Sequence, residues 1–414
     1  MRQSKLFTKT RREAPKDEES KNAQLLIRAG YIHKEMAGVY DYLPLGLMVL
    51  QKIQNIIREE MNGIGGQEIL MTTLQDPEIW KRTGRWDDQT VDNWFKTKLK
   101  NENELGIANT HEEPITQMLA QFAQSYKDLP IAVYQFQTKF RNELRAKSGI
   151  MRVREFLMKD LYSFSRTEAE FKEFYEKCAQ SYSNIFERVG LGEVTYRTVA
   201  AGGSFTGGFT DEFQTISDAG EDIIYVDDEG KIAINKEVYT DETISRLGLD
   251  RSKMKEEKSI EVGNIFPLGD KYPKALDLKL KDEEGNDFYP VMGSYGIGLG
   301  RLIGVITEVF GDEKGIVWPE SVSPFKYHLV EIISDKHEVR ETAERIYKKL
   351  GSDNALYDDR DLRAGEKFAD ADLLGIPSQI IISEKNVLSG LLEIKDRKTG
   401  EVKMIKEDEL QNLC

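Results

Sequence analysis

The sequence predicts an α/β protein with a larger α+β part and a smaller, mainly parallel α/β domain at its C-terminal end. Two patterns support this prediction. Strand-like stretches at 133–141 and 154–164 flank a basic loop, which predicts a hairpin. Beyond Pro324, segments with strand and helix periodicity alternate, and such alternation is typical of a mainly parallel sheet covered by helices.

Length and composition are those of an ordinary globular protein. The chain has 414 residues, enough for two or three domains, of which 39% are hydrophobic and 31% charged. No apolar run approaches the roughly 20 residues of a membrane helix, and residues 1–17 lack the apolar core of a signal peptide. We therefore expect a cytoplasmic protein with no membrane partner. The net charge of −14 argues against indiscriminate nucleic-acid binding, although local basic patches could still contact RNA.

The cysteines and histidines do not form a metal-binding pattern. Cys178 and Cys414 lie far apart in the sequence, and the four histidines are scattered. We therefore expect no structural zinc and no disulfide framework, which suits a reducing compartment.

The first long helix is expected over residues 47–61, where apolar positions recur at intervals of three and four. Three glycines between positions 63 and 66 should end this helix, and residues 67–71 have the pattern of a strand. The apolar face of the helix could pack inside the core of a monomer. The apolar positions are Leu50, Ile53, Ile57 and Met61.

Thr110 and Glu112 precede a helix expected over residues 114–124. A threonine followed by acidic residues is a common helix N-cap. A hydroxyl and a carboxylate two residues apart can also accept hydrogen bonds from a cation such as the ammonium of an amino acid. His111, which stands between them, is expected to pack rather than to catalyse. A further helix is expected over residues 168–189, with a stripe of aromatic side chains.

The loop of the predicted hairpin is dense in arginine and lysine. Arg141 and Arg152 lie at its mouth, Glu143 lies between them, and Phe156 belongs to the second strand. Arginine makes bidentate hydrogen bonds to phosphate or carboxylate oxygens. Two cations, an acid and an aromatic face suit a nucleotide triphosphate. The alternative is an exposed hairpin with solvated charge.

A glycine-rich run ends at Arg301, between a strand expected at 288–292 and a helix that extends to Phe310. The spacing differs from the dinucleotide-binding fingerprint, because Arg301 stands where the third glycine would follow Gly296 and Gly298. The Gly-Lys-Ser/Thr of a P-loop is absent from the sequence. Glycines let a ligand approach the backbone closely, and the arginine adds a cation.

In this order, these motifs closely resemble those of class II aminoacyl-tRNA synthetases, and in detail those of bacterial-type prolyl-tRNA synthetases. The hairpin resembles motif 2, and the glycine-rich run before Arg301 resembles motif 3. Residues 47–71 resemble motif 1, the dimer-interface motif, and residues 80–86 resemble a turn typical of the family. The resemblance covers nearly the whole chain. It implies a class II antiparallel sheet flanked by helices in a catalytic domain of residues 1–318, followed by an anticodon-binding domain of residues 324–414.

The resemblance also implies a reaction. The chain would ligate L-proline to tRNA(Pro) through a prolyl-adenylate, using ATP and Mg²⁺, as a homodimer. Arg141 would be the main catalytic residue, because it would neutralise both the proline carboxylate and the α-phosphate. The proline-binding residues would be Thr110, Glu112, Arg141, Phe164, Phe266 and Ser294. The ATP-binding residues would be Arg141, Glu143, Arg152, Phe156, Glu261, Asn264 and Arg301, with Glu261 also a ligand of Mg²⁺.

Four residues of the C-terminal domain would contact the anticodon. They mix hydrogen-bond donors and acceptors, which suits the edges of splayed RNA bases. A solvated charged loop is the alternative, and a hairpin is expected over residues 391–406. The four residues are Asp358, Arg360, Arg363 and Lys367.

The chain departs from the family pattern in several places. Thr72 stands where proline is usual, and Asn264 and Asp211 stand where histidine is usual, the latter in the glycine-rich stretch 201–214. Residues 237–260 are too short for the editing domain that typical bacterial members carry there, so cis editing should be absent. Discrimination against alanine would then depend on the pocket or on a separate trans-editing protein. Each ring methylene contributes only about 1–3 kcal/mol, so some mischarging is expected.

Three rival interpretations remain. A threonyl enzyme of the same subclass would bind zinc through Cys and His ligands that this chain lacks. A non-catalytic relative would be expected to have lost the motif arginines or the tRNA-reading domain. A stand-alone RNA-binding protein would explain the C-terminal domain alone.

Overall fold

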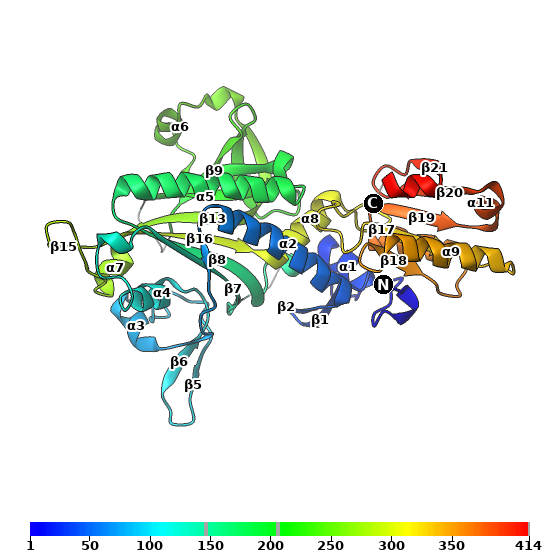
Figure 1. Cartoon of the computed structure of the whole chain (residues 1–414). Helices are drawn as coiled ribbons and strands as arrows, with labels where there is room; N and C mark the ends of the chain where they lie inside the picture. The colour runs from blue at the N-terminus through cyan, green and yellow to red at the C-terminus, as the bar shows by residue number, and fades with distance from the viewer. Residues whose placement is uncertain (145–147, 204–207, 413–414) are drawn as a thin grey trace. The chain divides into compact units, whose positions relative to one another are not determined.

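The computed structural model describes residues 1–144, 148–203 and 208–412, so parts of the predicted basic loop and glycine-rich turn lie outside the described residues. The chain forms two compact units. We call residues 37–39 and 54–305 the central unit. Residues 1–36, 40–53 and 306–414 form the second, which we call the terminal unit. Figure 1 labels many of the helices and strands of both units.

Within the described residues, the central unit is built on a nine-stranded sheet with the strand order β10-β9-β12-β11-β13-β16-β8-β7-β3. Most neighbouring strands are antiparallel, whereas β12 pairs with β9 and β3 pairs with β7 in parallel. The mainly antiparallel sheet that the resemblance implied is therefore confirmed. The strands are β3 (Gln67–Glu68), β7 (Ile131–Phe140), β8 (Glu155–Ser165), β9 (Thr195–Ala201), β10 (Phe209–Ile216), β11 (Asp222–Asp227), β12 (Ile232–Asn235), β13 (Lys255–Gly269) and β16 (Val291–Gly298).

The predicted hairpin is formed by β7 and β8. The two strands are antiparallel, with Phe140 opposite Glu155 and Lys139 opposite Phe156 at the end that carries the basic loop. On its other edge β8 pairs with β16, where Asp160 is opposite Gly296. The hairpin therefore lies next to the glycine-rich strand, although the two are far apart in the sequence.

Gly293, Gly296 and Gly298 lie within β16, so this strand extends beyond the expected 288–292, and Gly300 lies at the start of α8 (Leu299–Phe310). A Cβ atom on Gly296 would come within 2.5 Å of Met158 Cε and 2.9 Å of Asn264 Oδ1. Both side chains come from the neighbouring strands, β8 and β13. Glycine is therefore needed for close packing inside the sheet, and helix α8 follows directly.

Helix α5 (Glu168–Arg188) contacts β8, β16 and β13 and lies along the large sheet in Figure 1. Thr167 caps its N-terminus, because its hydroxyl accepts a hydrogen bond from the Glu170 N–H at 3.2 Å. The predicted aromatic stripe is largely buried, and Tyr182 and Phe186 pack against Phe213 of β10.

Shorter elements complete the central unit. Helix α6 (Asp241–Leu247) lies between the 3₁₀ turns Lys236–Val238 and Arg251–Lys253, in the segment that the sequence predicted to be too short for an editing domain. The other elements are α3 (Pro77–Arg82), α4 (Glu112–Leu119), α7 (Lys271–Ala275), the sheet of β4 (Leu74–Gln75), β6 (Glu104–Ile107) and β5 (Lys96–Lys98), and the pair β14 (Leu280–Lys281) and β15 (Asp287–Phe288).

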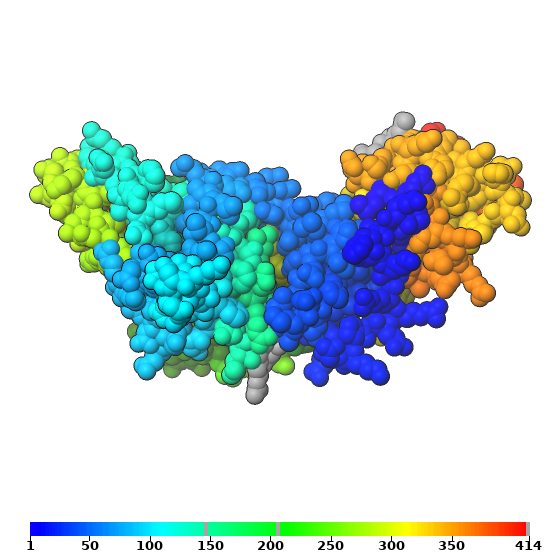
Figure 2. Space-filling model, turned by 90° about the horizontal axis from the view of Figure 1, so that it is seen from below, coloured from blue at the N-terminus to red at the C-terminus, as the bar shows by residue number. Residues whose placement is uncertain are grey.

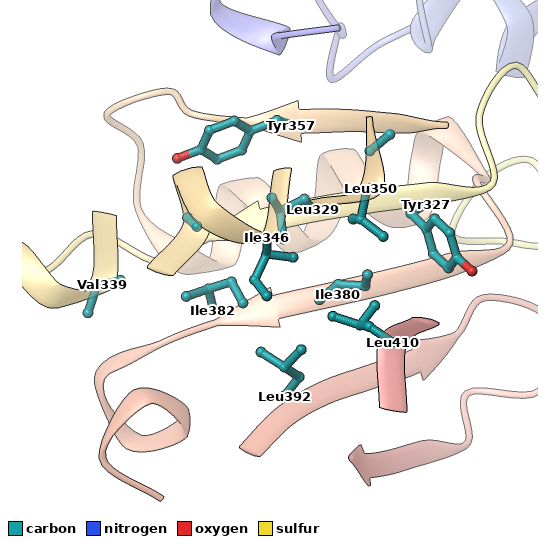
Figure 3. Close-up of a cluster of buried hydrophobic side chains, with 12 residues drawn as sticks. Tyr327, Leu329, Val339, Ile346, Leu350, Tyr357, Ile380, Ile382, Leu392 and Leu410 are labelled. Carbon is teal, nitrogen blue, oxygen red and sulfur yellow. The ribbon is translucent and has the colours of Figure 1, made fainter. Parts of the chain in front are cut away.

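The terminal unit contains a five-stranded mixed sheet with the order β18-β17-β19-β20-β21. Its first three strands are parallel, and the expected C-terminal hairpin adds two antiparallel strands. Helix α9 (His337–Leu350) buries its apolar stripe against this sheet in the cluster shown in Figure 3. The remaining elements are β17 (Tyr327–Glu331), β18 (Ala355–Asp358), β19 (Ser378–Ile382), β20 (Leu391–Asp396), β21 (Val402–Lys406), α10 (Ala364–Leu374), α11 (Glu384–Ser389), α1 (Lys21–Arg28), β1 (Ile32–Met36) and β2 (Val39–Tyr42).

Helix α2 (Pro44–Gly63) agrees with the long helix expected at 47–61 and, like α8, contributes residues to both units. Among the described residues, no helix combines the length and the apolar character that crossing a membrane requires.

Candidate active site

A cavity of about 300 Å³ opens in the central unit beside the β7–β8 hairpin. It lies between the hairpin, β13, the end of β16 and the start of α8. All seven residues that were predicted to bind ATP line it, so the structure brings together side chains from four separate parts of the sequence. These residues are Arg141, Glu143, Arg152, Phe156, Glu261, Asn264 and Arg301.

Of the three arginines of this cavity, Arg141 has the fewest hydrogen bonds and ion pairs to other side chains of the protein. Its guanidinium carbon lies 5.3 Å from the centre of the Phe156 ring. Within the described residues, no acidic side chain forms a hydrogen bond or ion pair with this guanidinium. Burial and the positive charge of Arg301 both lower the pKa of Arg141. Because arginine stays protonated at neutral pH, the cavity contains a desolvated positive charge that an anion would stabilise.

The other two arginines are held in place by the protein. The Arg152 guanidinium donates to the Glu143 carboxylate at 3.0 and 3.1 Å. Arg301 donates to the backbone oxygens of Met151 and Glu261 at 2.9 and 2.8 Å, and to the Glu261 carboxylate at 3.2 Å. Both side chains are therefore oriented before any ligand arrives.

Two carboxylates lie close together beside the cavity. Glu212 on β10 is directly opposite Asn264 on β13, and the Asn264 amide donates to Glu261 Oε1 at 2.8 Å. Burial and the negative charge of Glu261 raise the pKa of Glu212 to about 8. Carboxylate oxygens are the ligands that Mg²⁺ prefers, so Glu261 and Glu212 form a donor set that fits this ion.

A second possible metal-binding group is far less enclosed. His33, Glu35 and Asp41 have potential ligand atoms within 4.8 Å of one another, and all three side chains are exposed. Exposed acidic groups of this kind are common without a metal, so we assign no function to them.

Thr110, Glu112 and Ser294 form a buried hydrogen-bonded cluster, as the predicted proline site requires. Thr110 Oγ1 donates to Glu112 Oε2 at 2.6 Å, and Ser294 Oγ donates to Glu112 Oε1 at 3.0 Å. Glu112 is only 1% exposed. The Ser294 position on β16 is opposite Phe266 on β13 and Tyr162 on β8, so these three side chains share one face of the sheet.

The two phenylalanines predicted at the proline site differ in exposure. Phe266 is half-buried, which lets its ring form a wall of the site. Phe164 is completely buried in the hydrophobic cluster beneath, together with Met292 and Leu268. A direct contact with a substrate therefore fits Phe266 better than Phe164.

Arg85 belongs to this cluster, and the sequence reasoning missed it. Its Nη1 donates to Glu112 Oε2 at 3.3 Å, to Glu113 Oε2 at 3.0 Å and to the Tyr272 hydroxyl at 3.0 Å. Arg85 is 4% exposed and Glu113 is completely buried. Burial raises the pKa of Glu113 to about 7, and the charge of Arg85 opposes this rise. The sequence did contain a signal: Arg85 lies between Trp80 and Trp86, and an exposed turn would not need two tryptophans.

A second buried network lies under the site. His111 is completely buried, its Nε2 lies 3.0 Å from the Thr72 backbone oxygen and its Nδ1 lies 2.6 Å from Lys139 Nζ. The same Lys139 nitrogen donates to Asp160 at 2.9 Å. Burial and the charge of Lys139 lower the pKa of His111 to about 4, so its ring is neutral at pH 7. This burial agrees with the expectation that His111 packs rather than catalyses.

Each position that departs from the family pattern has partners in the structure. The Thr72 hydroxyl donates to the Leu74 backbone oxygen at 3.0 Å, and the Asn264 amide donates to Glu261. The Asp211 carboxylate accepts hydrogen bonds from the Tyr175 hydroxyl at 2.8 Å and from Arg197 at 3.0 Å. Each of the three side chains therefore has a hydrogen-bond partner in this chain.

The four residues predicted to contact an anticodon do not share one exposed surface. Asp358 is completely buried and accepts two hydrogen bonds from Arg360, at 2.8 and 2.7 Å. Lys367 is 1% exposed, and its ammonium donates to the backbone oxygens of Glu331 and Asp358. Arg363 is exposed at the start of α10. A base-reading contact needs accessible polar atoms, so it fits Arg363 and not the buried Asp358 and Lys367.

Comparison with known families adds independent information. The family model for the "tRNA synthetase class II core domain (G, H, P, S and T)" matches residues 95–310. The model for the "Anticodon binding domain" matches residues 326–414. The first of these spans the hairpin, the cavity and the glycine-rich strand, and the second spans the mixed sheet of the terminal unit.

Individual relatives match over their full length. A "Proline--tRNA ligase" of Wolbachia sp. subsp. Drosophila simulans (strain wRi) is 38% identical over 423 residues, covering 100% of this chain and 99% of the relative. One from Ehrlichia chaffeensis is 39% identical, with the same coverage. A crystal structure of prolyl-tRNA synthetase from Cryptosporidium parvum, complexed with halofuginone and AMPPNP, is similar in fold. Its TM-score is 0.78 at 19% identity, over 95% of this chain and 75% of that one.

Proposed function

Because this chain belongs to the proline–tRNA ligase family of class II aminoacyl-tRNA synthetases, we propose that it forms a prolyl-adenylate and transfers the prolyl group to tRNA(Pro). The observation that supports this reaction most directly is Arg141. Its guanidinium is a desolvated cation in a cavity of about 300 Å³, and no acidic side chain among the described residues forms an ion pair or a hydrogen bond with it. A triphosphate would supply the missing negative charge.

Two displacement steps account for the reaction. A carboxylate oxygen of proline attacks the α-phosphorus of ATP, and the bond to the β-phosphate oxygen breaks, releasing pyrophosphate. A hydroxyl of the terminal tRNA ribose then attacks the carbonyl carbon, and AMP leaves. Neither step forms a covalent bond to the protein, so catalysis depends on positioning and on electrostatic stabilisation.

The arginines of the cavity would divide the triphosphate charge between them. Arg141 would contact the α-phosphate and the proline carboxylate, where negative charge develops in the first step. Arg152 and Arg301 would hold the outer phosphates, and their existing bonds to Glu143 and Glu261 keep them oriented for this. These assignments are supported by the shared cavity and by the chemistry of the guanidinium group.

The adenine and the metal would use the remaining side chains. Phe156 offers an aromatic face for stacking on adenine, and the Glu143 carboxylate could accept a hydrogen bond from its amino group. Mg²⁺ would be held by Glu261 and Glu212, and when bound it would offset part of the triphosphate charge. Asn264 would orient the Glu261 carboxylate through its hydrogen bond.

The proline would bind at the Thr110, Glu112 and Ser294 cluster. The Glu112 carboxylate and the Thr110 hydroxyl would accept hydrogen bonds from the proline ammonium. The Arg85 guanidinium forms an ion pair with the Glu112 carboxylate at 3.3 Å. Phe266 would pack against the ring methylenes, and Phe164 would support it from the core.

We propose that the chain does not edit in cis. The segment between β12 and β13 contains only α6 and two 3₁₀ turns, and the relatives it matches over full length add no large insertion. Discrimination against alanine would then depend on the pocket or on a separate protein that hydrolyses alanyl-tRNA(Pro). The check is alanine-dependent exchange together with hydrolysis of purified alanyl-tRNA(Pro), and hydrolysis above the uncatalysed rate would contradict the proposal.

We propose that the chain forms a homodimer through α2 and β3. Strand β3 is the edge of the large sheet, and the side chains of Leu70 and Leu74 beside it are 74% and 59% exposed. An edge strand flanked by exposed leucines suits burial against a second copy. Light scattering at micromolar concentration would test this, and a monomer would contradict it.

We also propose a cytoplasmic location, where the buried thiol of Cys178 would stay reduced.

The decisive test is proline-dependent ATP–pyrophosphate exchange in Arg141→Ala, measured without tRNA. Removing a cation that touches the reacting atoms should reduce the exchange rate by at least about 100-fold, since loss of comparable electrostatic groups costs about 100- to 1,000-fold in other enzymes. Arg166→Ala is a matched control, because Arg166 is 43% exposed and pairs with Glu170 at the surface. Its exchange rate should stay within two-fold of the unchanged chain.

The amino-acid panel separates the alternatives. Exchange that is strongest with proline and detectable with alanine would support both the ligase activity and the absence of editing. Exchange with threonine alone would indicate the threonyl subclass. Normal exchange in Arg141→Ala would contradict the role of this residue, and no exchange with any amino acid would favour a non-catalytic RNA-binding protein.

A further inference from the structure

The N-terminal residues are a fixed part of the terminal unit. Gln3 is buried, and its Oε1 lies 3.0 Å from His328 Nε2 on β17. The Arg2 guanidinium donates to the Glu344 carboxylate at 2.8 and 2.6 Å. Ser4 donates to Asp359 through both its N–H and its hydroxyl, at 3.0 and 2.8 Å. A segment held in this way binds a partner without a large cost in conformational entropy.

Residues 5–12, which we call the basic segment, continue along the same surface. Their burial alternates: Leu6, Thr8 and Thr10 are partly buried, whereas the residues between them are exposed. Thr10 Oγ1 donates to Asp370 on α10 at 2.7 Å, which fixes the far end of the segment. Figure 2 shows the dark-blue N-terminal residues at the surface beside the orange residues of the terminal unit.

The exposed face of the basic segment combines cations with an aromatic ring. Phe7 is 81% exposed, and the side chains that flank it on this face are Lys5 and Lys9, followed by Arg11. Among the described residues, no acidic partner is found for these three cations. The chain as a whole carries a net charge of −14, so a basic cluster of this kind stands out from its surroundings.

A hollow of about 420 Å³ lies beneath the segment. Residues from positions 3–10 form one wall, and Asp359, Arg360, Asp361 and Leu362 form part of the other. The volume is within the range of about 300–1,000 Å³ that small-molecule pockets span. The wall offers both donors and acceptors, since Arg360 carries a guanidinium and Asp361 an exposed carboxylate.

A single exposed phenylalanine needs no explanation on its own. Two further features occur at the same place: flanking cations without acidic partners and a fixed backbone. The polar hollow adjoins this face, and of the exposed residues of the segment Lys9 lines it whereas Phe7 does not. Proteins that bind single-stranded nucleic acid combine cations for the backbone with aromatic rings on which bases stack. Charge complementarity therefore favours an RNA loop as the occupant.

We propose that the basic segment, together with the adjoining hollow, binds the unpaired bases of the tRNA anticodon loop, with Phe7 stacking on one base. Lys5, Lys9 and Arg11 contact the phosphates on either side of that base. This inference rests on the proposed function, which supplies tRNA(Pro) as the partner. It places part of the RNA-binding surface at the opposite end of the sequence from the matched anticodon-binding domain.

The test measures binding of an anticodon stem-loop of tRNA(Pro), and of an acceptor-stem minihelix, to the full chain. Phe7→Ala should bind the stem-loop about five-fold or more weakly, because losing one stacked base has an effect of this size, while minihelix binding is unchanged. Phe7→Trp should restore binding, because it keeps the stacking surface. Replacing Lys5, Lys9 and Arg11 by alanine together should reduce the salt slope of log K by about 2.

Phe122→Ala is the matched control, because Phe122 is 74% exposed in the central unit. It should bind the stem-loop as the unchanged chain does. Proline-dependent exchange is measured for every variant as a check on folding, since it needs no tRNA.

Three results would overturn the RNA site. They are Phe7→Ala binding within two-fold of the unchanged chain, an equal loss in Phe122→Ala, and a Phe7-dependent change in molecular mass without a change in RNA affinity. The last would make the segment a contact between copies of the chain. If the unchanged chain showed no proline-dependent exchange but bound the stem-loop through Phe7, the ligase proposal alone would fail.

Discussion

Replacing Arg85 by methionine should show how the site keeps two adjacent carboxylates buried. Arg85 Nη1 is shared between Glu112 and Glu113, which are 1% and 0% exposed. Methionine fills a similar volume but carries no charge, so both carboxylates lose their buried cation. Removing one partner of a buried ion pair typically costs about 3–5 kcal/mol. We expect the central unit of Arg85→Met to lose stability by this amount at pH 8.

The loss should depend on pH in a defined direction. The pKa of Glu113 is about 7 in the folded chain against 4.5 for an unperturbed glutamate. The folded state therefore binds more protons than the unfolded state between pH 4.5 and 7, and stability falls as pH rises through this window. Without Arg85 the folded pKa rises further, which extends the window upward. The stability difference between variant and unchanged chain should accordingly be smaller at pH 5.5 than at pH 8.

The assay is urea unfolding followed by tryptophan fluorescence. Three of the four tryptophans, Trp80, Trp86 and Trp94, form one cluster, and the Arg85 guanidinium lies 5.2 Å from the Trp80 ring. Arg166→Met is the control, because an exposed ion pair contributes less than about 1 kcal/mol. If Arg85→Met lost less than about 1 kcal/mol at pH 8, or lost the same amount at both pH values, the reasoning would be refuted.

Two further predictions concern the nucleotide and the terminal unit. Phe156→Leu should raise the KM for ATP about five-fold or more in exchange assays, since base stacking contributes about 1–3 kcal/mol. An unchanged KM would show that Phe156 does not stack. Burial lowers the pKa of His328 to about 4 from 6.5, so the unfolded chain binds more protons between these values and stability falls by up to about 3 kcal/mol as pH drops through them. The free energy of unfolding of His328→Asn, measured at pH 7.5 and 4.5, should lack this pH-dependent loss. An unchanged pH dependence would contradict its attribution to His328.

The elements of this fold were largely predictable, because their signals are local. Alternating and 3.6-residue periodicities predict the hairpin of β7 and β8, the long helix α2 and the alternating strands and helices beyond Pro324, and the structure confirms all three. The residues of the cavity were predictable for a different reason. The order of the motifs resembled that of a known family, and this resemblance assigned residues between 141 and 301 to one site. The structure brings them into one cavity.

The pairing of charged side chains was not predictable in the same way. Arg85 and Glu113 are 28 residues apart, and Lys367 donates to a backbone oxygen 36 residues away. A single sequence does not show which charges meet across such distances, so Arg85 was overlooked and Lys367 was expected at the surface. The packing requirement at Gly296 was not visible in the sequence for a related reason. It comes from Met158 and Asn264 on neighbouring strands and not from the glycine's own backbone conformation.

The arginines of the central unit differ in whether the protein already supplies their counter-charge. Arg85 has two internal carboxylates, Arg301 has one carboxylate and two backbone oxygens, and Arg141 has no acidic partner among the described residues. Arg141 is partly buried, and a desolvated charge without an ion-pair partner destabilises the folded state, so it persists where a ligand supplies the partner. Arg141→Ala should therefore abolish exchange while leaving stability unchanged or higher. The main effect of Arg85→Met should instead be a lower free energy of unfolding. If both variants lost stability equally, the distinction between a folding arginine and a substrate arginine would fail at this site.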